Sequence, residues 1–357
     1  MLGLLAKRAV PVASASAAPI MRTRVGAAAA TATTPRALTS TMAEARQISR
    51  MEARRSLRRA SSDANVSTGN QKVKALFIGG GKMAEAMISG LVNPPEGVPQ
   101  QFDVSAIDPA KNRRELLEKE YNITTFQTVG GAADLLKEAD LVILAVKPRT
   151  VKTVFEQIKK ATPAEDRNFT AISIIAGLTM DMMRTGLESD KVCRSMPNTP
   201  STIGEGMTVW TCDPCVDEST ETKISKLFEA CGEQERVDDE DILDSSTAIS
   251  GSGPAFFLIL QEAMVDSGVH MGLPRDLATR LVEQTMIGTA HYSSLSKNPV
   301  TILRNDITSP GGTTSEALFH LERGALRTVV SDACWAAFRK SRALGGKDFD
   351  IGPEINR

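Results

Sequence analysis

The chain has 357 residues, a length that allows two domains with a sizeable hydrophobic core. Its content of 41% hydrophobic and 24% charged residues is typical of a soluble globular protein. The formal net charge of −1 gives no reason to expect nucleic acid as a partner. No apolar run approaches the roughly 18 residues of a membrane span, so no membrane partner is expected either.

The first 71 residues differ in composition from the rest of the chain. Residues 1–43 contain lysine and arginine but no acidic residue, and they are rich in Ala, Ser and Thr. Such a leader resembles an organellar transit peptide, followed by a polar linker over 61–71. The arginines favour the mitochondrion and the Ser, Thr and Ala content favours the plastid. A disordered basic tail on a cytoplasmic protein is the alternative.

The stretch KALFIGGGKMAEAMISGL, residues 74–91, predicts a strand, a glycine turn and a helix in direct succession. Gly79-x-Gly81-x-x-Ala84 matches the dinucleotide-binding fingerprint in its Gly/Ala form. In that form Gly79 permits a tight turn, Gly81 allows close approach of a pyrophosphate, and Ala84 lets the helix lie near the strand. An ordinary glycine-rich turn is the alternative.

The helix that follows the glycines would present free N–H groups and a partial positive charge to the phosphates. The candidate pyrophosphate-binding residues are Gly79, Gly80, Gly81, Lys82, Met83 and Ala84.

Apolar runs of strand length alternate with helical patterns up to about residue 238. The expected strands include 75–78, 104–107, 141–146, 171–175 and 191–196, with further strands near 206–211 and 233–237. This alternation predicts a parallel doubly wound sheet over residues 72–238. From Glu240 the pattern becomes helical, which predicts a separate all-α domain over 239–345 and a tail over 346–357.

Asp108 ends the second predicted strand, where a carboxylate accepts hydrogen bonds from adenosine ribose hydroxyls and favours NAD. Lys111, Arg113 and Arg114 follow closely and could instead bind the 2′-phosphate of NADP. Asp108 could also simply cap the next helix. The coenzyme preference therefore stays open at this point.

Two further strand ends carry small or turn-forming residues. Ala145–Val146–Lys147–Pro148 and Ala176–Gly177 follow neighbouring predicted strands. Ligands of open α/β sheets bind at this carboxyl edge, and small residues would let a ribose and a nicotinamide lie against the backbone. Turn formation alone is the simpler alternative.

Ser309–Pro310–Gly311–Gly312–Thr313–Thr314 is the second candidate for binding chemistry. Its proline and glycines predict a turn with converging N–H groups, and Thr313-x-x-Glu316 fits a capping box. A carboxylate would suit this helix start. No metal site is expected, because Cys212-x-x-Cys215 lacks a second ligand pair. The three histidines, at positions 270, 291 and 320, fall in predicted helices without a visible partner.

Together these residues resemble the Δ1-pyrroline-5-carboxylate reductases, which catalyse the last step of proline synthesis. The matching stretches, in family order over about residues 73–343, are FIGGGKMAEAMISGL, LAVKP, AGLT, SMPNTP, SGSGPAFF, GLPRDLA and TSPGGTTSEAL. The resemblance implies a Rossmann domain followed by a helical dimerisation domain. It also implies NADPH or NADH as coenzyme, pyrroline-5-carboxylate as substrate, and a homodimer or a larger ring of dimers.

The resemblance also assigns roles by position. The nicotinamide half of the coenzyme would be lined by Ala145, Val146, Lys147, Pro148, Ile175, Ala176 and Gly177. The substrate would be bound by Glu240, Ser309, Gly312, Thr313 and Thr314, with the Thr314 hydroxyl on the ring nitrogen. Asp108 stands where the family often has a small polar residue beside the 2′-phosphate, a departure that puts a preference for NADP in doubt.

A cyclic imine with a protonated nitrogen accepts a hydride readily, so the enzyme must chiefly orient coenzyme and substrate. Two other functions share parts of this pattern. A β-hydroxyacid dehydrogenase would need an acid/base lysine in the helical domain, and none lies between residues 239 and 296. A dinucleotide sensor without chemistry would have no use for the Ser309–Thr314 turn.

Overall fold

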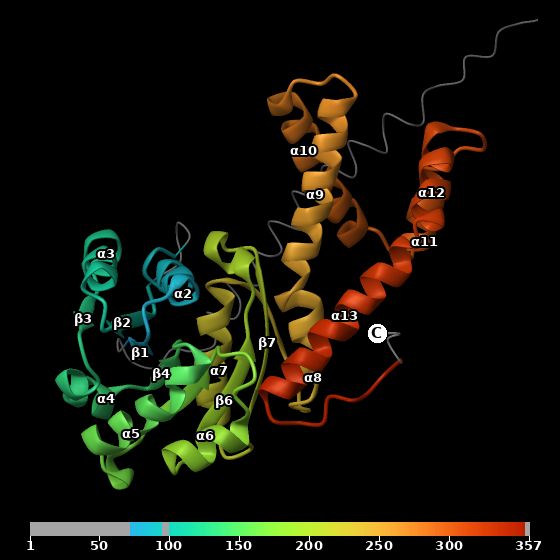
Figure 1. Ribbon diagram of the computed structural model, residues 1–357. Coiled ribbons are helices and arrows are strands. Elements are labelled where there is room, and N and C mark those ends of the chain that lie inside the picture. Colours follow the sequence, from blue (N-terminus) through green and yellow to red (C-terminus); the bar gives the residue numbers. More distant parts are fainter. Residues whose placement is uncertain (1–71, 95–99, 354–357) are drawn as a thin grey trace, which may run out of the picture. The chain divides into compact units, whose positions relative to one another are not determined.

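The computed structural model describes residues 72–94 and 100–353 (Figure 1). The predicted transit peptide and linker over 1–71 lie outside the described residues. Residues 95–99 and 354–357 lie outside them as well.

The described residues form one eight-stranded sheet in the order β3-β2-β1-β4-β5-β6-β7-β8. Its strands are β1 (Val73–Ile78), β2 (Phe102–Ile107), β3 (Thr124–Phe126), β4 (Leu141–Leu144), β5 (Thr170–Ser173), β6 (Val192–Met196), β7 (Gly206–Cys212) and β8 (Gly232–Arg236). β1 is the third strand in this order, with β2 and β3 on one side and β4 to β8 on the other. This is the order of a doubly wound sheet, as predicted.

One pairing departs from the predicted parallel arrangement, because β7 runs antiparallel to β6. All other neighbours in the sheet are parallel. The connection between β6 and β7 is the short segment 197–205, which contains a 3₁₀ turn over Thr199–Ile203. A parallel return needs a crossover of roughly a dozen residues or more, so this segment forces the reversal.

Helices cover both faces of the sheet. They are α2 (Lys82–Val92), α3 (Lys111–Tyr121), α4 (Ala133–Glu138), α5 (Val151–Ala161), α6 (Met180–Leu187) and α7 (Glu218–Glu229). The side chains of β1 alternate between two buried clusters, with Phe77 in one and Leu76 in the other. Because successive strand residues point to opposite faces, these clusters are the two cores of a three-layer domain.

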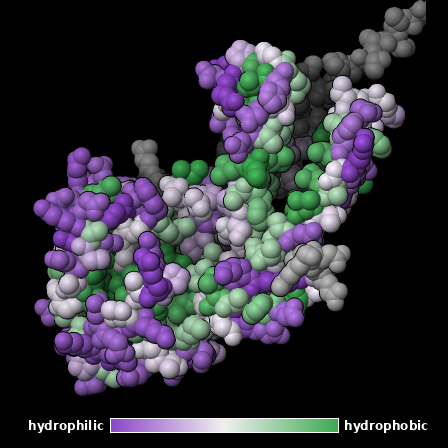
Figure 2. Space-filling model, in the orientation of Figure 1, coloured by the Kyte–Doolittle hydropathy of each residue, from purple (hydrophilic) through white to green (hydrophobic). Residues whose placement is uncertain are grey.

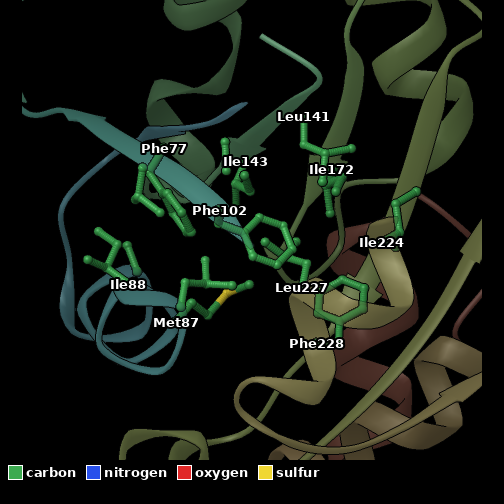
Figure 3. Close-up of a cluster of buried hydrophobic side chains, with 14 of the residues drawn as sticks. Phe77, Met87, Ile88, Phe102, Leu141, Ile143, Ile172, Ile224, Leu227 and Phe228 are labelled. Carbon is green, nitrogen blue, oxygen red and sulfur yellow. The ribbon is translucent and has the colours of Figure 1, made fainter. Parts of the chain in front are cut away.

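The first core joins the sheet to α2 and α7. Figure 3 shows Phe77 and Ile172 of the strands in one cluster with Met87 of α2 and Leu227 of α7. These side chains are 0–1% exposed. This packing holds α2 at its distance from β1, and thereby fixes the glycine turn that joins them.

The chain after β8 is helical throughout the described part, as predicted. Its elements are α8 (Ile242–Ser246), a π-helical turn (Thr247–Gly251), α9 (Gly253–His270), α10 (Arg275–Leu295), α11 (Val300–Asp306), α12 (Thr313–Arg323) and α13 (Leu326–Leu344). The sequence pattern turns helical from Glu240, and the first helix of this part begins at Ile242. Ser250 and Gly251 lie in the π-helical turn, where a side chain on Gly251 would come within 2.8 Å of Met196 Cε.

The helices α9 to α13 leave many large apolar side chains in contact with solvent (Figure 2). Phe257 and Ile259 of α9 are 64% and 67% exposed, and Val329 of α13 is 60% exposed. One helical stretch, Ile242–His270, is long and apolar enough to cross a membrane by length and composition alone. An apolar surface of this extent is also what a helix buried against another protein subunit presents.

Candidate active site

The strand ends that the sequence singled out lie along one edge of the sheet. Ile78, the last residue of β1, is aligned with Ile107 of β2 and with Leu144 of β4. Gly79, Asp108 and Ala145 therefore follow at the same level. This edge lies where the strand order reverses around β1, which is the place where open α/β sheets bind ligands.

Gly79 lies at the closest approach between two of these loops. Its φ of +106° is in the region that favours glycine. A Cβ added there would lie 2.6 Å from the carbonyl oxygen of Ala145. The Gly79 N–H donates to Ile107 O at 2.8 Å, and the Ala145 N–H donates to Ile78 O at 2.9 Å. Both conformation and space therefore require glycine at this position.

The start of α2, at Gly81 and Lys82, is exposed to solvent. Gly81 is exposed and is the N-cap residue, with φ of −67° and no side-chain cap. A Cβ added to Gly81 meets nothing within 4 Å. Lys82 is exposed, Met83 is half-buried, and Ala84 is buried against the strand core. Uncapped N–H groups beside open space fit a dinucleotide pyrophosphate.

Asp108 holds the glycine turn through backbone contacts. Its Oδ2 accepts the Gly80 N–H at 2.8 Å, and its Oδ1 accepts the Ala110 N–H at 2.8 Å. Gly80 is also held from the other side, because Arg113 Nε donates to its carbonyl oxygen at 2.7 Å. The sequence placed Asp108 at this strand end but gave no sign of the contact with Gly80, and the N-cap residue of α3 is Ala110 rather than Asp108.

Glu85 keeps Arg113 in that position. An Arg113 guanidinium nitrogen lies 2.7 Å from Glu85 Oε2, and the Tyr121 hydroxyl donates to Glu85 Oε1 at 3.3 Å. Burial acts to raise the pKa of Glu85, but the hydrogen bond and charge of Arg113 outweigh it and lower this pKa below its ordinary value. Glu85 therefore stays ionised at neutral pH.

The loops after β4 and β5 supply the predicted nicotinamide side. Ala145 and Val146 are half-buried, whereas Lys147 and Pro148 are exposed. After β5, Ile175 is buried and Ala176 is half-buried. Ala145, Val146 and Ala176 thus lie at the edge of the sheet with part of their surface open, and their contact with a nicotinamide stays a prediction.

Gly177 connects the β5 loop to the helical segment. Its φ is +77°, and a Cβ added there would overlap Leu344 at the end of α13. Close packing of α13 thus fixes the end of the β5 loop.

Glu240 supports the same loop. Its Oε1 accepts the Met180 N–H at 2.9 Å and a hydrogen bond from Arg194 at 3.0 Å. Glu240 thus lies close to the loop after β5, and its proposed contact with substrate stays a prediction.

Arg194 is the centre of a buried ion-pair network that the sequence did not indicate. It belongs to the apolar strand β6 and is 2% exposed. One guanidinium nitrogen lies 2.8 Å from Asp244 Oδ1, and Asp244 of α8 is fully buried. Ser341 of α13 donates to the same carboxylate at 2.8 Å, and Lys347 lies 3.0 Å from Asp244 Oδ2. The only sequence signal was a cation inside an apolar strand, which demands a buried partner.

The turn before α12 differs in detail from the prediction. α12 begins at Thr313, and its N-cap is Gly312 without a side-chain hydrogen bond. The predicted capping box is therefore wrong, because Thr313 is already the first helical residue. The Gly312 N–H donates to Ser309 O at 3.1 Å, and Gly311 has a φ of +68°. Ser309 and Thr313 are exposed, while Thr314 is half-buried.

No hydrogen bond within the described part of the chain joins this turn to the loops at the strand ends. The helical segment is joined to the sheet elsewhere, by the Arg194–Asp244 pair, by Leu344 against Gly177, and by the Asn198 side chain, which donates to Ser250 O at 3.1 Å. The Ser309–Thr314 turn and the strand-end loops are thus fixed by different contacts.

The Cys212-x-x-Cys215 pair shows no features of a reactive or metal-binding site. Cys212 is buried, and its thiol lies 3.1 Å from Glu221 Oε1. Burial, then the hydrogen bond to Glu221, raises the pKa of Cys212 to about 12. Within residues 72–94 and 100–353, no group of three His, Cys, Asp or Glu side chains could hold a metal ion.

Comparisons with known proteins match both parts of the chain. Residues 240–344 match the family described as pyrroline-5-carboxylate reductase dimerisation, and residues 74–177 match the family described as NADP oxidoreductase coenzyme F420-dependent. Pyrroline-5-carboxylate reductase of Arabidopsis thaliana is 35% identical over 77% of this chain and 96% of the relative. The Synechocystis enzyme of the same name is 34% identical over 76% and 98%.

Solved structures agree with these sequence matches. A pyrroline carboxylate reductase of Plasmodium falciparum with NADP bound has a TM-score of 0.68 at 30% identity and covers 78% of this chain and 100% of its own. A pyrroline-5-carboxylate reductase of Coxiella burnetii has a TM-score of 0.67 at 30% identity, with 77% and 99% covered.

Replacing Gly79 or Gly81 by alanine should affect the protein in different ways, the first through stability and the second through dinucleotide binding. Gly79→Ala introduces a positive-φ strain and a clash with Ala145, so we expect a loss of stability of about 1–3 kcal/mol. Gly81→Ala has room in the free protein and should change stability little. It should instead weaken dinucleotide binding, because the added methyl occupies the open space beside α2. Chemical denaturation and calorimetric titration measure the two effects, and equal behaviour of the variants would contradict the assignment.

The Arg194–Asp244 pair should make stability depend on pH. Burial acts to raise the pKa of Asp244, but the hydrogen bond and charge of Arg194, with Ser341 and Lys347, lower it below its ordinary value of 3.8. The stabilisation is therefore present above pH 3.8 and is lost as the pH falls through the lowered folded-state pKa.

Asp244→Asn should cost at most about 3–5 kcal/mol at pH 7, because the buried guanidinium of Arg194 then keeps Glu240 as its one remaining anionic partner among the described residues. The gap to the wild type should narrow as the pH falls below 3.8 and through the lowered folded-state pKa, because protonation of Asp244 removes the charge that the variant already lacks. Denaturant titrations at pH 7 and below pH 3.8 measure the difference in the free energy of unfolding. Asp190→Asn, at an exposed position, is the control. A gap independent of pH would show that the charge of Asp244 does not contribute.

Proposed function

The chain belongs to the pyrroline-5-carboxylate reductase family, and we propose that the strand-end loops and the Ser309–Thr314 turn are the two halves of its active site. The chain is an NAD(P)-dependent oxidoreductase that transfers a hydride to the imine carbon of 1-pyrroline-5-carboxylate and gives L-proline. The observation that carries this function is 35% identity to a relative of that name over 96% of its length.

The 79–84 loop holds the pyrophosphate of the coenzyme in this proposal. Its support is the uncapped start of α2, the open space at Gly81 and the close approach of Gly79 to Ala145. The bound coenzyme supplies the hydride. Residues 145–148 and 175–177 line its nicotinamide half, and their small side chains leave the backbone of both loops within reach of a flat ring.

The Ser309–Thr314 turn binds the carboxylate of the substrate. The exposed hydroxyl groups of Ser309 and Thr313 and the uncapped N–H groups of α12 are donors suited to an anion. Thr314, one residue further along, donates or accepts a hydrogen bond at the ring nitrogen. Glu240 completes the pocket, and its contact with the Met180 N–H keeps the β5 loop in place.

No built-in strong acid is required by this chemistry. The imine nitrogen can take its proton from solvent, so the protein contributes orientation rather than proton transfer. The histidines agree with this role: His320 is exposed beside Glu316 at 3.5 Å, and His270 and His291 lie in α9 and α10. None of the three lies in the loops at the strand ends.

We further propose that the protein is a homodimer in which the turn of one copy faces the strand-end loops of the other. The apolar side chains exposed on α9 to α13 need a partner surface, and residues 240–344 match a family described by its dimerisation. A second copy would also bring together halves that no hydrogen bond joins among the described residues of one copy. Larger rings of dimers are an extension of the same arrangement.

Localisation is proposed from composition. The acid-free, arginine-bearing residues 1–43 support import into the mitochondrion, with the plastid as the alternative destination. A fluorescent protein fused after residues 1–70 should accumulate in one of these organelles. A diffuse cytosolic signal would remove the proposal.

Thr314→Ala tests the substrate half. Loss of one hydrogen bond to a charged ring should lower kcat/KM for pyrroline-5-carboxylate by about tenfold to a hundredfold. Coenzyme binding should not change, because the residue does not touch the dinucleotide loops. Thr301→Ala, at an exposed position of α11, is the matched control. Unchanged turnover and KM in Thr314→Ala would reject this role.

A further inference from the structure

We propose that this chain binds NADH in preference to NADPH, and that Asp108 is the residue that sets the preference. The inference rests on the proposed role of the 79–84 loop in binding the dinucleotide. It concerns the adenosine end of the coenzyme, about which the family match leaves both coenzymes possible.

Asp108 is positioned to meet the adenosine ribose. It follows β2 directly and lies against Gly80, which is the place of the ribose-binding acid in dinucleotide-binding βαβ units. Each carboxylate oxygen accepts one backbone N–H, at 2.8 Å, and a carboxylate offers about four acceptor sites in total. Acceptor capacity therefore remains for ribose hydroxyls, which are donors. A 2′-phosphate is itself an anion that accepts hydrogen bonds, so Asp108 repels it.

Asp108 is not free to move away from a 2′-phosphate. Its two hydrogen bonds come from the backbone of Gly80 and Ala110, and both have an ionised acceptor, which makes them strong. Turning the side chain outward would leave the buried Gly80 N–H without this acceptor. The turn that holds the pyrophosphate thus depends on the same carboxylate that meets the ribose.

The arginines that could neutralise a 2′-phosphate have other partners. Arg113 bridges Gly80 O and Glu85 Oε2, both at 2.7 Å, and its side chain is only 20% exposed. Arg114 donates to Asp108 O at 2.9 Å and to Pro109 O at 3.0 Å. To reach a phosphate, either guanidinium would have to give up hydrogen bonds that shape the glycine turn.

Lys111 is the most exposed of the three basic residues near the strand end. Its side chain is 81% exposed, and its ion pair with Glu115 is 3.5 Å long. A single solvated ammonium contributes little to binding, about 1 kcal/mol or less. It does not offset the repulsion from a fixed carboxylate. The Plasmodium falciparum relative was solved with NADP bound. The preference for NADH is therefore proposed for this chain alone, on the basis of Asp108 and its neighbours, and not for the family.

Calorimetric titration of the full chain with NADH and with NADPH tests the proposal directly. NADPH should bind at least about tenfold more weakly, as expected for like charges brought together in a binding site. Asp108→Asn removes the charge and should reduce the ratio of the two dissociation constants severalfold. Asp103→Asn, an exposed position at the other end of β2, is the matched control and should leave the ratio unchanged.

Arg113→Met separates the two possible roles of this arginine. If Arg113 supports the glycine turn, the variant should bind both coenzymes more weakly and to a similar extent. A selective loss of NADPH affinity would identify Arg113 as a phosphate ligand and overturn the proposal.

The ratio of the NADPH and NADH dissociation constants of the wild type tests the proposed preference even if a variant fails to fold. Equal or tighter binding of NADPH, with pyrroline-5-carboxylate still reduced, overturns the preference and leaves the proposed function intact. Binding of neither coenzyme would instead reject the proposed function.

Discussion

The close approach of Gly79 to the carbonyl oxygen of Ala145 is the constraint on which the site depends. A Cβ would come within 2.6 Å of that oxygen, so the first and fourth strands can end side by side only with glycine between them. This contact brings the start of α2 and the β4 loop to one edge of the sheet. The pyrophosphate half and the nicotinamide half of the proposed dinucleotide site thereby become continuous.

The second constraint joins the sheet to the helical segment. Arg194 of β6 forms a buried ion pair with Asp244 of α8, and Ser341 of α13 donates to the same carboxylate. Gly177 packs against Leu344 a short distance further along α13. Because Glu240 also holds the Met180 N–H, the loop that follows β5 is fixed from the helical side. Positioning of the proposed nicotinamide half therefore depends on both domains.

The sequence predicted the features that depend on neighbouring residues. It did not predict the contacts between residues that are far apart in the chain. The strand, glycine turn and helix over 74–91 could be predicted because apolar period and turn chemistry act over a few residues. The Arg194–Asp244 pair spans 50 residues, and no periodicity indicates which acid a buried arginine will meet. The capping box at Thr313 failed because the helix starts one residue earlier than a cap requires. Asp108 was placed correctly, but its contact with Gly80 needed the structure.

The central claim is that the dinucleotide loops of one copy work with the Ser309–Thr314 turn of another. Two variants of low activity, Gly81→Ala, which weakens dinucleotide binding, and Thr314→Ala, can be unfolded together and refolded into mixed dimers. Sites shared between copies predict recovery of about a quarter of the wild-type activity, because half of the dimers are mixed and each of these has one intact site. A mixture no more active than its two components, with mixed dimers verified by mass, would contradict the account.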